Sequence, residues 1–285
     1  MTTLGIVYRP QFPPELLQPT AVAAERAGVE ELWLWEDCFL ESGIAAATAA
    51  LAWTTRLTVG VGILPVPMRN PALTAMEIAT LARLFPGRVR IGLGHGVQEW
   101  MEQIGARVES PMTLLREYVV AVRRLVAGES VTLEGRYVRL RDVQLGWPPQ
   151  PVPPIDVGAV RSRTIALAGE VADGMVLSAE TPADGLGAAI AAYDTARRAR
   201  PGRVTAFLIA VAGPDAAARY AAQVAEWGLD PARTHGVHGG PAEIAAGVGR
   251  WAAAGVDAVI LQPVADADPI EYARFAGEQV RPLLG

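Results

Sequence analysis

Short runs of β-branched and aliphatic residues alternate along the chain with longer segments rich in alanine and leucine. The short runs predict eight strands, at residues 4–8, 31–35, 57–63, 88–93, 155–157, 174–177, 204–211 and 258–261. The longer segments predict helices at residues 14–27, 42–53, 71–84, 113–127, 162–171, 184–200, 214–227, 241–254 and 269–284. Strands that alternate with helices are expected to form a parallel sheet. Their continuously apolar sequences are typical of strands buried on both faces.

Eight such units in 285 residues favour an α/β fold of the closed (β/α)8 TIM-barrel type, and we expect residues 1–285 to form one domain. A doubly wound dinucleotide-binding sheet would carry a glycine-rich turn after its first strand, whereas residues 8–13 contain no glycine. The alternation is interrupted between units four and five. There, residues 131–133 and 137–140 predict a small hairpin, and the proline-rich residues 147–154 predict an extended linker.

Composition narrows the possible functions. A net charge of -5 gives no support for binding nucleic acid or an anionic membrane surface. No stretch is apolar for about 18 residues and no leader pattern opens the chain, so we expect a cytoplasmic protein. The single cysteine, Cys38, excludes an internal disulfide. His235 and His238 lie in a glycine-rich segment with no third ligand evident, so we expect no metal; these two could instead line the substrate entrance.

In a (β/α)8 barrel the active site lies at the carboxyl ends of the strands. Residues 158–163, which open a predicted helix, combine small residues, a serine and two arginines, a pattern suited to a phosphate. An ordinary turn with Ser162 as the helix N-cap explains the same pattern. The glycines at 60, 62, 92, 94 and 96 allow the backbone to approach a planar ring, or reflect tight packing in a small barrel.

Several segments together resemble the luciferase-like monooxygenase superfamily. They are residues 56–65 with 69–72 and 79–81, 88–96, 137–154, 167–174, and 240–244 with 254–257. The resemblance extends over essentially the whole chain. Within that superfamily the chain is most similar to the branch that uses the deazaflavin coenzyme F420, which includes methylenetetrahydromethanopterin reductases and F420-dependent glucose-6-phosphate dehydrogenases.

The resemblance implies roles for individual residues near the coenzyme ring. Asp37 and Cys38 stand where the family has an Asp-His pair that faces the ring, and Cys38 removes the imidazole that serves as an acid or base in some members. Gly62 and Ile63 match the position of a non-prolyl cis peptide behind the ring. Because Cys38 stands in place of the family histidine, the catalytic role of that histidine is not carried over to this chain.

The resemblance also implies contacts with the coenzyme tail. Gly94, His95 and Gly96 match the stretch beside the ribityl chain, and the phosphate loop corresponds to Ala159, Val160, Arg161 and Ser162. His95 is a candidate proton relay, or else a hydrogen-bond partner of the tail without a chemical role. Asp37, Glu36 and Glu99 are alternative acids. A structural or solvent-exposed carboxylate is the competing interpretation for Glu36 and Glu99.

By resemblance we expect hydride transfer between F420 and a small organic substrate, catalysed by a homodimer. A flavin mononucleotide (FMN) monooxygenase is the first alternative, and a coenzyme-free barrel that acts as a binding subunit is the second. A barrel aldolase that uses a Schiff base is excluded, because all 25 basic residues are arginine and the chain has no lysine. Neither the substrate nor the direction of hydride transfer can be read from the sequence.

Overall fold

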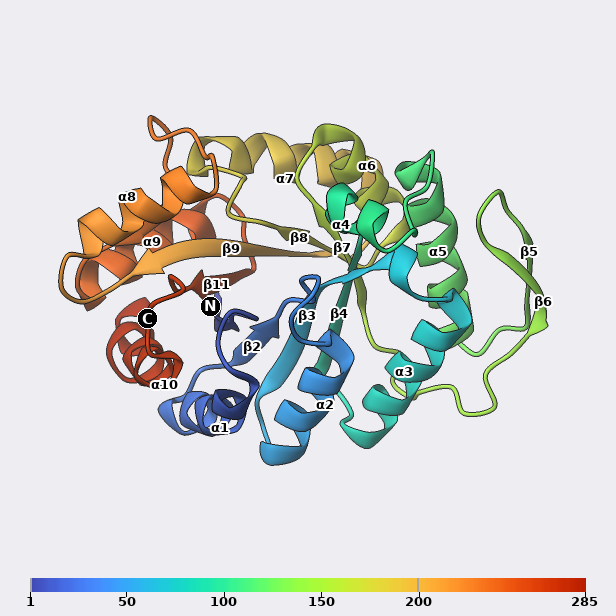
Figure 1. The fold of residues 1–285 in the computed structure, drawn as a ribbon, viewed down its shortest axis with the longest axis horizontal. Helices are drawn as coiled ribbons and strands as arrows, with labels where there is room; N and C mark the ends of the chain where they lie inside the picture. Colours follow the sequence, from blue (N-terminus) through green and yellow to red (C-terminus); the bar gives the residue numbers. More distant parts are fainter. Residues whose placement is uncertain (1, 199) are drawn as a thin grey trace.

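The computed structural model describes residues 2–198 and 200–285, and within them eight parallel strands close into a barrel (Figure 1). The strands, in the order in which they pair, are β1 (Thr3–Tyr8), β2 (Glu31–Leu34), β3 (Thr58–Pro65), β4 (Val89–Gly94), β7 (Ile155–Ala159), β8 (Gly174–Leu177), β9 (Arg203–Val211) and β11 (Ala258–Gln262). The pairing of β11 with β1 joins the last strand to the first. The predicted (β/α)8 barrel is therefore confirmed.

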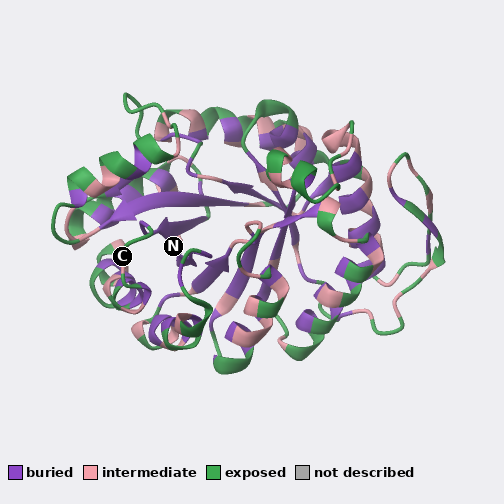
Figure 2. Cartoon of the chain, in the orientation of Figure 1, coloured by how far each residue is buried: buried purple, intermediate pink, exposed green. Residues whose placement is uncertain are grey.

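Helices surround the barrel and bury their inner faces against the strands (Figure 2). The α-helices are α1 (Leu17–Ala27), α2 (Gly43–Trp53), α3 (Pro71–Leu84), α4 (Gln98–Gln103), α5 (Pro111–Val126), α6 (Ser162–Val171), α7 (Ala183–Arg197), α8 (Ala216–Glu226), α9 (Pro241–Ala253) and α10 (Pro269–Arg274). The 3-10 helices η1 (Pro14–Leu16), η2 (Val66–Met68) and η4 (Arg281–Leu284) and the π-helix η3 (Phe275–Val280) complete the set. Among the described residues, none of the helices has the length and apolar character needed to cross a membrane.

The expected hairpin is present between units four and five. Strands β5 (Val131–Glu134) and β6 (Arg139–Val143) pair antiparallel and project away from the barrel (Figure 1). Three elements were not predicted: η2, α4, and the short strand β10 (Gly236–His238), which pairs parallel with β9 where we expected a loop. None of the three is long enough to set up a hydrophobic period. The predicted helix 184–200 includes Ala199, which lies outside the described residues, and α7 ends at Arg197.

Side chains fill the barrel interior near the amino ends of the strands. Near the amino ends of the strands, Arg90 pairs with Asp156 at 2.7 Å and Arg203 pairs with Glu31 at 2.8 Å. Above these pairs lies the indole of Trp33, which donates a hydrogen bond to Glu31 and packs so closely on Gly60 that a Cβ there would overlap the ring. Tight packing thus explains Gly60, and open space begins only toward the carboxyl ends of the strands.

Candidate active site

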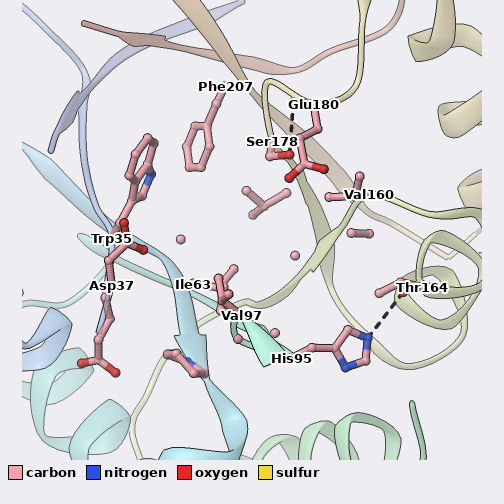
Figure 3. A pocket seen from close by; sticks show the side chains of 18 of the residues that line it. Trp35, Asp37, Ile63, His95, Val97, Val160, Thr164, Ser178, Glu180 and Phe207 are labelled. Atoms are coloured by element: carbon pink, nitrogen blue, oxygen red, sulfur yellow. Dashed lines mark hydrogen bonds between the residues drawn. The ribbon is translucent and has the colours of Figure 1, made fainter. Parts of the chain in front are cut away.

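A cavity of about 580 Å³ opens at the carboxyl ends of the strands, where the barrel fold predicts an active site. Its wall contains most of the residues expected to bind the coenzyme: Asp37, Gly62, Ile63, Gly94, His95, Gly96, Ala159, Val160 and Arg161. Figure 3 shows side chains from separate strand ends and from α6 around one space, with His95 and Thr164 on one side and Trp35 and Phe207 on the other. The fold therefore brings these separate segments of the sequence together.

Glycines on neighbouring strands form a cradle around Ile63. A Cβ on Gly158 would lie 2.6 Å from Ile63 Cγ2, and one on Gly94 would lie 2.9 Å from Ile63 Cδ1. The peptide bond between Gly62 and Ile63 is cis, as the resemblance predicted. The missing side chains leave a shallow floor of backbone and one aliphatic side chain. A flat ring fits such a floor, which supports the ring interpretation for Gly94. A Cβ on Gly62 would instead lie within 3 Å of Trp33 and Phe207, so packing explains that glycine.

One edge of the cavity ends at the amino terminus of α6. The helix N-cap is Arg161 and no side chain caps the first turn, so the interpretation of Ser162 as the N-cap is wrong. Ser162 is exposed and does not line the cavity, whereas Arg161 does. Uncapped N–H groups, the positive end of a ten-residue helix and one guanidinium are features that bind phosphate.

His95 lies at the end of β4 and lines the cavity, with its ring toward α6 (Figure 3). Its Nε2 atom is 3.4 Å from the Thr164 hydroxyl, and its buried Nδ1 atom has no hydrogen-bond partner. Burial lowers the pKa of His95, and a backbone interaction at Pro111 partly opposes that shift. The ring is therefore neutral at pH 7 and able to accept or donate a proton.

Two acidic residues after β2 have different surroundings. Burial raises the pKa of Asp37, and the nearby Arg9 opposes the shift. Glu36 lies 5% exposed, accepts hydrogen bonds from both terminal nitrogens of Arg69, and accepts another at 2.7 Å from the Gly43 N–H at the start of α2. This carboxylate holds a loop and a helix in place, so the geometry favours a structural role for Glu36 over proton transfer.

Cys38, which stands in place of the family histidine, does not line the cavity. Its sulfur lies 3.6 Å from that of Met68. Burial raises the pKa of the Cys38 thiol, and the carboxylates of Glu36 and Asp37 raise it further. A protonated thiol outside the cavity wall does not replace an imidazole base.

Other residues of the cavity were not singled out by sequence. Trp35, Phe207 and Trp227 form an aromatic wall, and Gln262 lies at the end of β11. The position of Gln262 at the end of a barrel strand is a signal in the sequence, but the sequence assigns it no role, and Trp227 follows a helix and carries no such signal. His235 and His238 do not line the cavity, because His235 is buried against the carbonyl of Ala179 and His238 lies beside the ring of Tyr220.

Comparison with known proteins places this barrel in a family. The family model described as luciferase-like monooxygenase matches residues 4–268. The chain belongs to the luciferase-like monooxygenase family. Membership agrees with the resemblance found in the sequence and with the position of the cavity.

Two curated relatives of this luciferase-like chain illustrate its similarities. It is 32% identical over 183 residues to a 5,10-methylenetetrahydromethanopterin reductase of Methanolobus tindarius, covering 64% of this chain and 56% of the relative. It is 34% identical over 238 residues to an F420-dependent hydroxymycolic acid dehydrogenase of Mycobacterium tuberculosis, covering 78% of this chain and 66% of the relative. The chain thus spans between half and two thirds of these relatives.

Solved structures show the same fold. An F420-dependent secondary alcohol dehydrogenase in complex with an F420-acetone adduct superimposes with a TM-score of 0.88, at 20% identity, over 100% of this chain and 99% of the other. The F420-dependent tetrahydromethanopterin reductase of Methanopyrus kandleri gives a TM-score of 0.84 at 19% identity, over 100% of this chain and 99% of that enzyme. A type II Baeyer-Villiger monooxygenase in complex with FMN gives 0.78 at 15%, over 100% of this chain and 97% of the other. The luciferase-like barrel is common to all three.

Proposed function

We propose that the chain is an oxidoreductase that transfers a hydride between coenzyme F420 and a small organic substrate. The observation that carries the proposal is the cavity: a glycine-lined floor at Gly62, Gly94 and Gly158 leads to the uncapped amino end of α6. A flat ring joined to a phosphate matches those two features. Relatives whose names specify F420 favour the deazaflavin over FMN.

The residues of the chain bind and orient the reactants in this proposal, and the coenzyme supplies or accepts the hydride. The backbone around Ile63 supports the ring, while Arg161 and the α6 N–H groups hold the phosphate. Ala159 and Val160 line the path between them. Asp37 and His95 are the titratable groups of the wall that are placed to hold or move a proton.

An FMN-dependent monooxygenase is the alternative, and the solved luciferase-like structure that contains FMN favours it. A coenzyme-free barrel that acts as a binding subunit is the second alternative. Titration of the purified protein with oxidised F420 and, separately, with FMN distinguishes the three. We expect micromolar or tighter binding of F420 and much weaker binding of FMN. The reverse preference would support the monooxygenase, and binding of neither would overturn the enzyme proposal.

A matched pair of arginine variants tests the phosphate site. We expect Arg161→Gln to weaken F420 binding at least tenfold, because a charge-assisted contact with a phosphate is lost. Arg250→Gln, on the exposed face of α9, serves as the control and is expected to leave the affinity unchanged. Equal affinities for the two variants would contradict the placement of the phosphate at α6.

We also propose that the chain forms a homodimer through the outer face of α3. Leu73, Met76 and Leu84 are 47%, 56% and 62% exposed, and their spacing places them on one side of the helix. An exposed apolar stripe of this kind is typical of a subunit interface. Light scattering is expected to give twice the chain mass of 30.1 kDa, and Met76→Lys is expected to shift the protein toward the monomer.

A further inference from the structure

The cavity has a second side that the coenzyme, as proposed, does not use. The expected coenzyme contacts beyond Asp37 come from β3, β4 and β7, which are consecutive in the barrel, and β11 lies four strands away from β4. The opposite side is formed by β2, β8, β9 and β11, together with Trp227 after α8. This division rests on the proposed function, and it leaves the side formed by β2, β8, β9 and β11 for the substrate.

The substrate side is an aromatic wall. The ring of Trp35 lies 5.7 Å from that of Phe207 and 6.0 Å from that of Trp227, measured between centroids. Figure 3 shows Trp35 and Phe207 facing the same space. These rings offer a large apolar contact surface with little conformational freedom to lose, so they suit an apolar ligand body.

Two polar groups interrupt this apolar wall without having partners. Gln262 is 0% exposed, and neither its side-chain oxygen nor its side-chain nitrogen makes a hydrogen bond. The indole Nε1 of Trp35 is also buried and unpartnered. An unsatisfied buried amide is costly, so such groups in functional cavities are ordinarily satisfied by a ligand or by water. Gln262 can donate to one oxygen atom or accept from a hydroxyl group.

The charges around the cavity limit what the ligand can carry. Among the described residues that line it, Arg161 is the only guanidinium, and it belongs to the α6 end. Glu36, Asp37 and Glu180 contribute carboxyl groups to the wall, and Glu36 is already paired with Arg69. The buried guanidinium of Arg9 lies behind this wall, 5.9 Å from the centroid of the Trp227 ring, and its Nη1 donates to Gln223 and to the carbonyl of Pro263. A ligand that brought a carboxylate or phosphate to the aromatic side would therefore lose its hydration without meeting a cation in the wall itself.

We infer that the aromatic side binds an uncharged, mainly apolar substrate with one carbonyl or hydroxyl oxygen, and that Gln262 anchors this oxygen. The amide nitrogen donates to a carbonyl oxygen, and the amide oxygen accepts from a hydroxyl group. The same residue therefore serves a ketone and the corresponding alcohol. Gln262 is a specificity-determining residue in this proposal, while Trp35, Phe207 and Trp227 contact the apolar body.

Ligand-observed NMR titrations of the F420-loaded protein test this inference with acetophenone and with its anionic analogue 4-acetylbenzoate. We expect acetophenone to bind at least tenfold more tightly. Gln262→Leu, which keeps the size and removes both polar atoms, is expected to weaken acetophenone binding at least tenfold. Gln18→Leu, on the exposed face of α1, is the matched control and leaves binding unchanged. Equal binding of the two probes, or undiminished binding by Gln262→Leu, would overturn the inference.

A second measurement separates ligand recognition from a role in folding. Because Gln262 makes no side-chain hydrogen bond, Gln262→Leu is expected to leave the melting temperature of the unliganded protein unchanged or to raise it. A loss of several degrees would assign Gln262 a structural role and overturn the inference. If the protein binds no F420 but prefers acetophenone in a Gln262-dependent way, the proposed function fails and the inference about the ligand stands.

Discussion

Carboxyl groups near the cavity differ in their surroundings, and their acid–base behaviour follows from this difference. Glu36 is held by Arg69 and by the first turn of α2. Glu41, five residues later, is half-buried and has one carboxyl oxygen that is buried without a hydrogen-bond partner. Burial raises the pKa of Glu41 to about 7, and the nearby Glu15 adds to the shift. Glu41 therefore titrates near neutral pH.

This shift predicts a pH-dependent loss of stability. The folded state holds the proton of Glu41 more tightly than the unfolded state does. The contribution of this proton to the free energy of unfolding is therefore complete below pH 4.5 and is lost as the pH rises through about 7. Glu41→Gln removes the titration. We expect the variant to be more stable than the wild type by about 1 kcal/mol at pH 8, allowing for solvent screening of a half-exposed group, and equally stable at pH 5.

Thermal unfolding at the two pH values provides the measurement. Glu278→Gln, exposed near the end of the chain, is the control and is expected to change the melting temperature at neither pH. A difference between Glu41→Gln and the wild type that is the same at pH 5 and pH 8 would contradict the assigned pKa.

Sequence reasoning identified individual residues of the cavity wall where the ends of strands determine their position. Nine expected coenzyme residues line the cavity, because each follows or ends a barrel strand. Cys38 and Ser162 do not line it, although both lie beside residues that do. Side-chain direction and pairing depend on the folded neighbours, as with Glu36 and Arg69, so the sequence alone did not separate these cases.

At the scale of elements, the width of the cavity depends on contacts between neighbouring strands. Gly158 of β7 and Gly94 of β4 both lie against Ile63 of β3. The sequence showed the glycine density but left open whether it reflected packing or a ring site. The structure divides the set: Gly60 makes room for Trp33, whereas Gly94 makes room for Ile63 at the cavity floor. Gly158, which was not part of that set, makes room for the same side chain.

Gly158→Ala tests that division. The added methyl group would displace Ile63 from its place on the floor, since the contact of 2.6 Å is too short. We expect at least tenfold weaker F420 binding, and a loss of about 1–3 kcal/mol in unfolding free energy from overpacking. Calorimetric titration and denaturant unfolding measure the two effects.

The control for this variant is Gly187→Ala. Gly187 lies inside α7, and a Cβ there would meet nothing within 4 Å. We expect this substitution to stabilise the protein by up to about 1 kcal/mol through helix propensity and to leave coenzyme affinity unchanged. Weakened binding in both variants would indicate a general effect of glycine replacement and would contradict the floor model.

At the scale of the whole molecule, barrel closure is the step that builds the site. The order of strands and helices was readable from the sequence because each element is long and periodic. The contents of the aromatic side were not, because Trp35, Phe207, Trp227 and Gln262 are separated by up to 227 positions and meet only when β11 pairs with β1. Spacing along one strand or helix carries no information about such a set.

A buried ion pair between Arg90 of β4 and Asp156 of β7 lies where these two strands pair. It joins the first four units of the barrel to the last four across 66 positions, which include the projecting hairpin. Asp156 is 1% exposed and Arg90 makes three hydrogen-bond contacts with its carboxylate. Removal of one member of a buried pair leaves the other charged group without compensation.

We therefore expect Asp156→Ala to destabilise the whole barrel by about 3–5 kcal/mol. The exposed pair between Arg233 and Asp184 is the matched control, and Asp184→Ala is expected to leave the unfolding midpoint within experimental error, since solvent screens that pair. Urea unfolding followed by tryptophan fluorescence and far-UV circular dichroism measures both variants. If this pair holds the two halves of the barrel together, the unfolding midpoints from fluorescence and from circular dichroism fall together for Asp156→Ala. A shift of the midpoint in only one signal, or an unchanged midpoint, would mean that the stability of the barrel does not depend on this contact.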